Sequence, residues 1–294
     1  MKKLIVALIG ILVVPGFNGA VWQAKPSATP VVRWEPATLV NGAPCLFRVM
    51  PAEPLKSLRG SWFGRTVFFD EDPNNQTWYG VAGVDIDTKP GRYTLSLTGV
   101  SITGKRVEFD QVVSVGKAYY PIRKLTVPRK YTELDAETLA RVKREQALKR
   151  DVFDRVTAER QWSGRFTAPL SGAITAVFGA QRTFNGVRQS IHQGVDYQAS
   201  IGTPVAATNS GTVILAQELF FEGNCVVIDH GQGLLTLYMH LSAFNVKEGD
   251  RVTRGQIIGL SGATGRVTGP HLHLGVRWQG MYLNPATLLE LLLP

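Results

Sequence analysis

The sequence predicts a mainly β protein with an N-terminal immunoglobulin-like β-sandwich, a linker helix and a C-terminal antiparallel β-sheet domain. Three observations support this. Hydrophobic and polar residues alternate within 25–118, a charged stretch without glycine follows at 132–160, and short apolar runs separated by glycine fill 163–294. The 294 residues suit two domains of about 150 residues each. Hydrophobic residues make up 44% of the chain and charged residues 19%, which excludes wholesale disorder.

Residues 25–118 show the pattern of half-buried antiparallel strands. Tyr93, Leu95 and Leu97 alternate with polar residues, and the same period of two continues through Val107–Val115. Several short strands with turns between them are typical of a β-sandwich of about 100 residues. Nothing in this segment points to catalysis. Glycan binding, partner docking and shielding of a neighbouring groove therefore all stay open as its role.

Residues 119–162 are predicted to form a basic linker that contains a helix. Residues 117–160 hold twelve basic and seven acidic side chains. The excess favours an anionic surface, but a solvated helix face is the better interpretation. Thr132 is the expected N-cap, and one apolar stripe is expected to pack on a neighbouring domain. The members of that stripe are Leu139, Val142, Val152 and Val156.

The C-terminal segment 163–294 is nearly neutral, with eight basic and seven acidic residues. Charge alone is too little to predict nucleic-acid binding, so no nucleic acid is expected as a partner. Short apolar runs such as Val226–Ile228 and Leu234–Tyr238 are separated by glycines. This pattern predicts a compact antiparallel sheet with tight turns.

The N-terminus has the pattern of an export signal. Two lysines precede the apolar run Leu4–Val14, and small residues follow it. We predict a signal peptide at residues 1–20, with cleavage after Ala20 or Ala24. The apolar run is shorter than the ~20 residues of a spanning helix. The mature chain is therefore expected in the periplasm or cell envelope, without a stable membrane span.

The two cysteines, Cys45 and Cys225, lie in different predicted domains. Export permits a disulfide, but two separate buried thiols are the expectation, because free cysteine is commonly a small core residue. The chain contains no C-x-x-C pair, which excludes a zinc knuckle or a dithiol redox site of that type.

All five histidines lie in the last predicted domain, in patterns that suit a metal. His192 and Asp196 have an H-x-x-x-D spacing, and His271 and His273 have an H-x-H spacing. Residues two apart on a strand project from the same face, so His271 and His273 point to one place. Imidazole nitrogens and carboxylate oxygens are normal zinc ligands, and a catalytic zinc keeps three of them plus a position for water. His240 follows an apolar strand, so the candidates outnumber the ligand positions.

These motifs stand within longer blocks of sequence between residues 165 and 290. The blocks are Phe184-Asn185-Gly186, His192-Gln-Gly-Val-Asp196, Gly202-Thr-Pro-Val-Ala206, Val227-Ile-Asp-His-Gly231, Tyr238-Met-His-Leu241 and Gly265-Arg-Val-Thr-Gly-Pro-His-Leu-His-Leu-Gly275. Their order resembles that of the lysostaphin-type zinc endopeptidases of bacterial cell walls, also called LytM-domain peptidases. The resemblance implies a LytM-type peptidase domain at residues 163–294.

The resemblance also implies the roles of the site residues. It assigns one zinc ion to His192, Asp196 and His273, and it makes His240 and His271 the catalytic histidines. The implied reaction is amide hydrolysis by zinc-activated water, with the two histidines orienting or deprotonating the water and stabilising the oxyanion. The separate roles of these two histidines stay open.

Two features fall outside the implied site. His230 matches none of its positions and is interpreted as a structural histidine that makes hydrogen bonds. Glu218–Glu222 is interpreted as an insertion at the edge of the substrate groove, where it would influence substrate range.

Export and the resemblance together predict a metallo-endopeptidase that hydrolyses the peptide cross-links of bacterial peptidoglycan. The expected partners are peptidoglycan peptide stems and, as an open question, a cell-envelope regulator. One alternative is a LytM-domain regulatory or binding module that activates a separate cell-wall amidase. Another is an intact enzyme held latent by its N-terminal β-domain or helix. A biotinyl carrier is excluded because it needs a modifiable lysine at an exposed turn and no lysine follows Lys247. A phosphate loop is excluded because the glycine-rich run Gly259–Gly269 lacks the required Lys-Ser/Thr pair.

Overall fold

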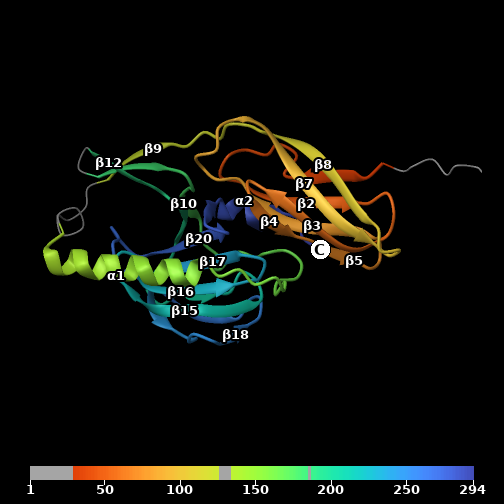
Figure 1. The fold of residues 1–294 in the computed structure, drawn as a ribbon. Coiled ribbons are helices and arrows are strands. Elements are labelled where there is room, and N and C mark those ends of the chain that lie inside the picture. Colours follow the sequence, from red (N-terminus) through yellow and green to blue (C-terminus); the bar gives the residue numbers. More distant parts are fainter. Residues whose placement is uncertain (1–28, 126–133, 185–186) are drawn as a thin grey trace, which may run out of the picture.

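The computed structural model describes residues 29–125, 134–184 and 187–294. The predicted signal peptide, the expected N-cap Thr132 and the Asn185-Gly186 pair lie outside these residues. The described chain is mainly β, which confirms the predicted fold class, and it forms two four-stranded sheets, one three-stranded sheet and one ten-stranded sheet. Figure 1 shows the four-stranded sheets on the right and the ten-stranded sheet on the left, beside a long helix.

Residues 31–115 form two antiparallel four-stranded sheets around a common core. In β7 (Gly91–Ser101), Leu95 and Leu97 are buried and their polar neighbours are exposed, as the period of two predicts. One sheet has the order β1 (Val31–Glu35), β2 (Pro44–Met50), β6 (Thr77–Gly83), β5 (Asp70–Asp72), and the other has the order β4 (Arg65–Phe68), β3 (Leu55–Trp62), β7, β8 (Arg106–Val115). The immunoglobulin-like character of this sandwich stays a prediction.

Residues 174–283 build the ten-stranded sheet that carries the candidate site. Its main path has the order β10 (Ile174–Ala176), β13 (Gly194–Gln198), β20 (His271–Trp278), β17 (Leu234–Phe244), β16 (Gly223–Asp229), β15 (Gly211–Leu219), β18 (Arg251–Val252). Three further strands pair beside this path: β14 (Pro204–Ala206), β19 (Ile257–Ser261) and β21 (Met281–Leu283). The pairings are antiparallel, as the sequence predicts.

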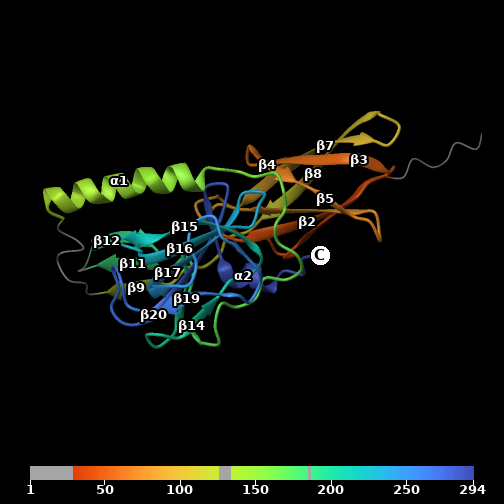
Figure 2. The ribbon, with the colours of Figure 1, turned by 90° about the horizontal axis from the view of Figure 1, so that it is seen from below.

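Both faces of this sheet are covered, which explains the continuous apolar runs in its strands. In β16, Val226 and Ile228 pack into one hydrophobic cluster, while Cys225 and Val227 pack into another beneath α1 (Ala136–Phe153). A strand that is buried on both faces needs apolar residues at consecutive positions rather than at alternate ones. Figures 1 and 2 both show α1 lying along the part of the sheet that contains β15 and β16.

The helix α1 is shorter than predicted. It begins after Asp135, whose Oδ1 accepts a hydrogen bond from the Thr138 N–H at 2.7 Å, so Asp135 is the N-cap. Beyond its last turn the backbone bonds to the turn between β16 and β17 instead of continuing the helix. The Thr157 carbonyl oxygen there accepts a hydrogen bond from the Gln232 N–H at 2.7 Å. Local composition alone does not reveal such tertiary bonds.

The prediction that one apolar stripe of α1 is buried is wrong at two of the four residues. Val142 and Val152 are buried, but Leu139 and Val156 are each 42% exposed. Val156 lies beyond the end of the helix, and the buried Phe153 completes the contact with the sheet. The early helix end is therefore the physical reason for the error at residue 156.

The β-sandwich and the C-terminal region share one hydrophobic core. Trp62 of the sandwich packs in the same cluster as Trp278 and Leu283. Gly83 permits this approach, because a Cβ at that position would lie 2.5 Å from a Leu283 methyl carbon. The short helix α2 (Pro285–Glu290) contacts β2 as well as β13 and β20, and Figure 1 shows it between the two parts. The domain boundary at residue 163 stays a prediction, and this core crosses it.

The linker contributes a strand that the sequence analysis did not predict. β9 (Ile122–Leu125) pairs in parallel with β11 (Gln181–Phe184), and β11 pairs with β12 (Val187–Ile191). The Gln181 N–H also donates a hydrogen bond to the Pro121 carbonyl oxygen at 2.8 Å. Because β11 and β12 precede the H-x-x-x-D motif, the linker reaches the neighbourhood of the candidate site.

Cys45 and Cys225 are buried and unbridged, which confirms the prediction of two separate thiols. Burial raises the pKa of each thiol, so both stay protonated at neutral pH. They act as small residues of the core.

We expect a chain that starts at Ser163 to lose its fold rather than to gain activity. Without residues 1–162, the apolar side chains of Trp278, Met281 and Leu283 lose their cover, and large exposed apolar patches promote association. Size-exclusion chromatography and near-ultraviolet circular dichroism of residues 163–294 would check this, with residues 29–294 as the control. A monomeric fragment with cooperative unfolding would contradict the expectation.

Candidate metal centre

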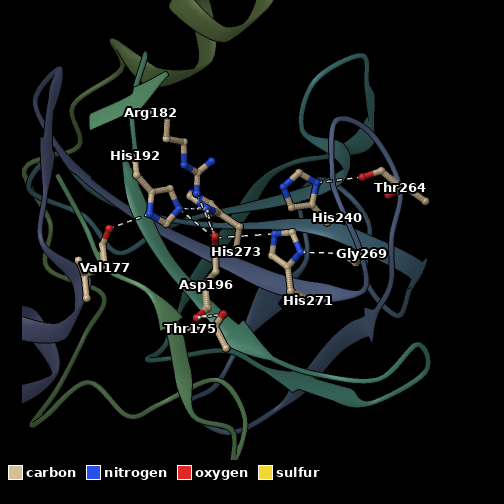
Figure 3. A network of polar contacts seen from close by, with 10 residues as sticks. All are labelled: Thr175, Val177, Arg182, His192, Asp196, His240, Thr264, Gly269, His271 and His273. Carbon is tan, nitrogen blue, oxygen red and sulfur yellow. Dashed lines mark hydrogen bonds and ion pairs between the residues drawn. The ribbon is translucent and has the colours of Figure 1, made fainter. Parts of the chain in front are cut away.

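The five residues that the sequence analysis assigned to the site converge at one place on the ten-stranded sheet. They are His192, Asp196, His240, His271 and His273, and Figure 3 shows them together. β13 and β20 lie side by side in a register that sets Asp196 opposite His273. His192 follows β12, and its N–H donates a hydrogen bond to the Ala180 carbonyl oxygen. Four of the five are buried, and His271 is partly exposed.

Three donor atoms form a triangle that fits one metal ion. Asp196 Oδ1 lies 2.9 Å from His192 Nε2 and 2.8 Å from His273 Nδ1, and the two nitrogens are 3.0 Å apart. Ligands about 2.0 Å from a tetrahedral zinc ion are separated by about 3.3 Å, which is close to these spacings. The structure therefore brings the expected ligand set together.

A hydrogen bond on the far side of His192 determines which ring nitrogen carries a proton. His192 Nδ1 lies 2.8 Å from the carbonyl oxygen of Val177, which can only accept. Nδ1 therefore carries the hydrogen, and neutral His192 turns the lone pair of Nε2 toward Asp196. A lone pair and a carboxylate oxygen 2.9 Å apart repel each other unless a proton or a cation lies between them. A metal ion meets that requirement, so donor chemistry and spacing agree.

The charge states of the triangle also suit a divalent metal. Burial raises the pKa of Asp196, but hydrogen bonds from the rings of His192 and His273 outweigh burial and hold that pKa well below its usual value when a proton lies between the donor atoms. A cation bound between the same atoms would lower the pKa of Asp196 in the same direction. Burial lowers the pKa of His273 to about 4, against the opposing effect of Asp196. At neutral pH the triangle thus contains a carboxylate and a neutral imidazole at His273, the protonation states that bind zinc.

Arg182 is a site residue that the sequence analysis missed. From β11, its Nη2 donates a hydrogen bond to Asp196 Oδ2 at 3.0 Å (Figure 3). The two oxygens of Asp196 are thus divided, with Oδ1 in the donor triangle and Oδ2 on the guanidinium. Burial lowers the pKa of Arg182, and the charge of Asp196 opposes this. The sequence did contain one signal for Arg182, which lies two residues before Phe184 of the family motif.

His240 and His271 border the triangle with one ring nitrogen each held by the backbone. His240 Nδ1 donates to the Thr264 carbonyl oxygen at 2.9 Å, and His271 Nδ1 donates to the Gly269 carbonyl oxygen at 2.8 Å (Figure 3). In the neutral rings these bonds leave the lone pair on Nε2. His271 Nε2 lies 3.8 Å from Asp196 Oδ1, and the ring centres of His240 and His271 are 4.9 Å apart. Two imidazoles that can accept a proton therefore lie beside the metal position.

His240 has a left-handed backbone conformation, with φ of 66°. Residues other than glycine rarely adopt such angles without compensating contacts. Its N–H donates to the Glu222 carbonyl oxygen at 2.9 Å, and its ring is held by Thr264 as described above. Burial, and to a smaller extent His273 and His271, lower the pKa of His240 to about 3. Its imidazole is therefore neutral at physiological pH.

Comparison with known proteins places this geometry in a family. The model of peptidase family M23 matches residues 190–285, which contain the five site residues. The crystal structure of a Pseudomonas aeruginosa protein assigned to peptidase M23 is similar at a TM-score of 0.66 and 30% sequence identity, over 85% of this chain and 94% of that one. The chain belongs to peptidase family M23. Membership confirms the resemblance to lysostaphin-type peptidases that the motifs indicated.

Two curated relatives match the M23 region more strongly in sequence. One is the peptidoglycan DD-endopeptidase ShyA of Vibrio cholerae, 48% identical over 97 residues, which are 33% of this chain and 23% of that protein. The other is the DD-carboxypeptidase/endopeptidase Mpg of Neisseria meningitidis, 46% identical over 98 residues, again 33% of this chain and 23% of that protein. These matches span less than a quarter of each relative.

His230 has the structural role that the sequence analysis expected. It is fully buried, and its Nδ1 donates to the Ser210 carbonyl oxygen at 2.7 Å. Its Nε2 lies 2.8 Å from Thr236 Oγ1 and accepts that hydroxyl proton. Both ring nitrogens are thus used within the fold of the M23 domain. Burial lowers the pKa of His230 to about 4.

We expect Arg182→Met to weaken zinc binding by about 10- to 100-fold, the usual effect of removing a residue that orients a metal ligand. The substitution leaves the buried Asp196 Oδ2 without its guanidinium partner, and this loss outweighs the relief of charge repulsion between Arg182 and the metal. Competition with a chromogenic chelator measures the affinity. Arg251→Met, at an exposed position, is the matched control. Equal affinities for the two variants would refute the role assigned to Arg182.

His230 should make the M23 fold less stable in acid. Its pKa falls from 6.5 unfolded to about 4 folded, so the unfolded chain binds more protons as pH drops between these values. The free energy of unfolding should therefore fall by about 2 to 3 kcal/mol more in wild type than in His230→Gln between pH 7.5 and 4.5. Urea denaturation at several pH values gives the free energy of unfolding as a function of pH for wild type and for His230→Gln. Parallel curves would show that His230 does not titrate in this way.

Proposed function

We propose that the protein is a zinc metallo-endopeptidase that hydrolyses peptide cross-links of bacterial peptidoglycan. The observation that carries the proposal is the triangle of His192 Nε2, Asp196 Oδ1 and His273 Nδ1, bordered by two further histidines. Membership of peptidase family M23 supports peptide hydrolysis. The name of the V. cholerae relative, a peptidoglycan DD-endopeptidase, supports peptidoglycan as the substrate class.

The residues of the site divide the chemistry between metal binding and proton transfer. His192, Asp196 and His273 would hold the zinc ion, which would supply the Lewis acidity that activates water and polarises a peptide carbonyl. His240 is neutral because burial lowers its pKa to about 3. Its Nε2 lone pair therefore accepts a hydrogen bond or a proton from the attacking water.

His271 completes the proposed constellation. Its Nδ1–H is committed to the Gly269 carbonyl oxygen, which orients Nε2 toward the region beside Asp196. From there Nε2 exchanges protons with the reacting groups, and the proton removed from water passes to the leaving amine nitrogen. In both histidines Nδ1 donates a hydrogen bond to a backbone carbonyl oxygen, so the geometry does not assign them different roles. Kinetic measurements on single variants would distinguish the general base from the general acid.

The proposed site of action is the periplasm or cell envelope. The pattern of an export signal at residues 1–20 supports this location, and so does the name of the V. cholerae relative, a peptidoglycan DD-endopeptidase. Neither helix in the part of the chain that the structure describes has the length and apolar character of a membrane span. Peptide stems of peptidoglycan are the proposed binding partner, and a cell-envelope regulator is a further proposal without an assigned surface.

Digestion of purified sacculi by the full mature chain tests the proposal. Mass spectrometry of the released muropeptides should show loss of cross-linked dimers, inhibition by a chelator and recovery with zinc. The masses of the products identify the bond that is cut. Intact sacculi, together with stimulation of a separate amidase by the chain, would instead favour a regulatory module.

His240→Ala should retain zinc but lose about 10²- to 10⁴-fold in kcat, the usual contribution of one general acid–base residue. The metal triangle does not include His240, so its donor atoms stay in place. Zinc content by elemental analysis and turnover of a cross-linked muropeptide dimer would be measured together. His192→Ala provides the contrast, because it should lose the metal as well as the activity. Undiminished turnover of His240→Ala would remove His240 from the mechanism.

A further inference from the structure

The position of His240 depends on two loops that meet beside it. One is the turn between β15 and β16, whose Glu222 carbonyl oxygen accepts the His240 N–H. The other contains Thr264, whose carbonyl oxygen accepts the Nδ1–H of the same residue. Since His240 has a positive φ, both contacts are needed to hold a conformation that its own backbone disfavours.

The two loops are also tied to each other. The Asn224 N–H donates to Thr264 Oγ1 at 2.9 Å, and the Arg266 N–H donates to the Phe221 carbonyl oxygen at 2.9 Å. The guanidinium of Arg266 lies 4.4 Å from the centre of the Phe221 ring. Gly223 permits the close approach of the β15–β16 turn to Thr264, because a Cβ at residue 223 would lie 2.3 Å from Thr264 Oγ1. A shift of the β15–β16 turn therefore moves both supports of His240.

The helix α1 holds that turn from outside the sheet. Glu145 Oε2 accepts a hydrogen bond from the Phe220 N–H at 2.9 Å, and Lys149 forms an ion pair with Glu222. Arg141 joins the same group, with its Nε 2.7 Å from Glu145 Oε1 and its Nη2 3.5 Å from Glu218 Oε1. Three successive turns of α1 thus contact the segment that the sequence analysis interpreted as a groove-edge insertion.

The ion pair between Lys149 and Glu222 is shielded from water. Their side chains are 21% and 15% exposed, respectively. Within the described residues, Glu222 Oε2 is buried and has no hydrogen-bond partner. Lys149 is therefore the main compensation for this carboxylate, and removing one partner of a shielded pair leaves an unfavourable buried charge.

The C-terminal end of α1 packs on the sheet through buried apolar side chains. Val152 and Phe153 pack against Leu219, Val227 and other residues of β15–β17. The helix therefore connects the core of the sheet with the turn that supports His240. The residues of the metal triangle lie on β13, on β20 and directly after β12, so its donor atoms do not depend on this connection.

We propose that α1 is a positioning element for the reaction, and that the Lys149–Glu222 pair fixes His240 through the β15–β16 turn. The proposal rests on the proposed function for its kinetic part, but the placement of the His240 ring can be tested without activity. Glu222 contributes its carbonyl oxygen to His240 and its carboxylate to Lys149, so side-chain variants leave the backbone acceptor in place. Lys149 is thus a positioning residue rather than a catalytic one.

The test uses Lys149→Met in the full chain, which removes the charge but keeps most of the aliphatic stem. For a cross-linked muropeptide dimer, kcat should fall by about ten-fold or more, because small displacements of a catalytic group are costly. KM and zinc affinity should stay within about two-fold of wild type. In spectra of the ¹³C-histidine-labelled chain, the His240 ring resonances should shift, while those of His230 should not.

Three further variants separate positioning from general loss of stability. Lys143→Met, at an exposed position of the same helix, should behave as wild type. Lys149→Arg should restore kcat, because it keeps the charge. Lys149→Met/Glu222→Met replaces the pair with apolar groups of similar length and should also recover activity, because no buried charge is left.

Two results would overturn the proposal. One is an unchanged kcat and unshifted His240 resonances in Lys149→Met. The other is a fall in kcat that follows zinc loss or a lowered melting temperature, which would indicate a structural role alone. If wild type fails to cleave the dimer, the proposed function fails, and the His240 resonances still decide whether α1 positions this ring.

Discussion

The pairing of β13 with β20 is the constraint on which the rest of the site depends. Its register places Asp196 opposite His273, and the same carboxylate oxygen then meets His192 from the end of β12. Bringing a carboxylate and imidazoles together in a buried place is unfavourable unless a cation balances their lone pairs. The sheet supplies the rigidity that enforces this arrangement, since a slip of one residue would turn Asp196 to the other face.

Around this triangle, the backbone does much of the orienting. Carbonyl oxygens of Val177, Thr264 and Gly269 each fix Nδ1–H of one imidazole, and in the neutral ring each bond leaves Nε2 unprotonated. A single kind of contact thus sets the tautomer of three histidines, two of them proposed to act in catalysis and one to bind the metal. Arg182 orients the carboxylate of Asp196 in a similar way, because it donates a hydrogen bond to Oδ2, the oxygen that is not part of the metal triangle.

The sequence predicted most of the site because its residues lie in short motifs with fixed local geometry. His192 and Asp196 flank one turn, and His271 and His273 share a strand face, so their spacing reports their proximity. Arg182 was missed because its partner lies fourteen residues away and no local pattern links them. Periodicity likewise predicted the buried face of β7, whereas β9 escaped detection because four residues are too few to show a period. The end of α1 depended on tertiary bonds at Thr157 that composition does not record.

The core shared by the sandwich and the C-terminal region bears on how the chain acquires its structure. Ribosomes make the sandwich strands first, yet one wall of the sandwich core is formed by Trp278, Leu283 and Leu293, which follow the site residues in the sequence. The sandwich therefore stays incomplete until these later residues have been made, which delays packing that an independent domain would complete early. Long-range closure of this kind slows folding. It also couples the formation of the metal site to the packing of the sandwich, since the two regions complete their shared core together.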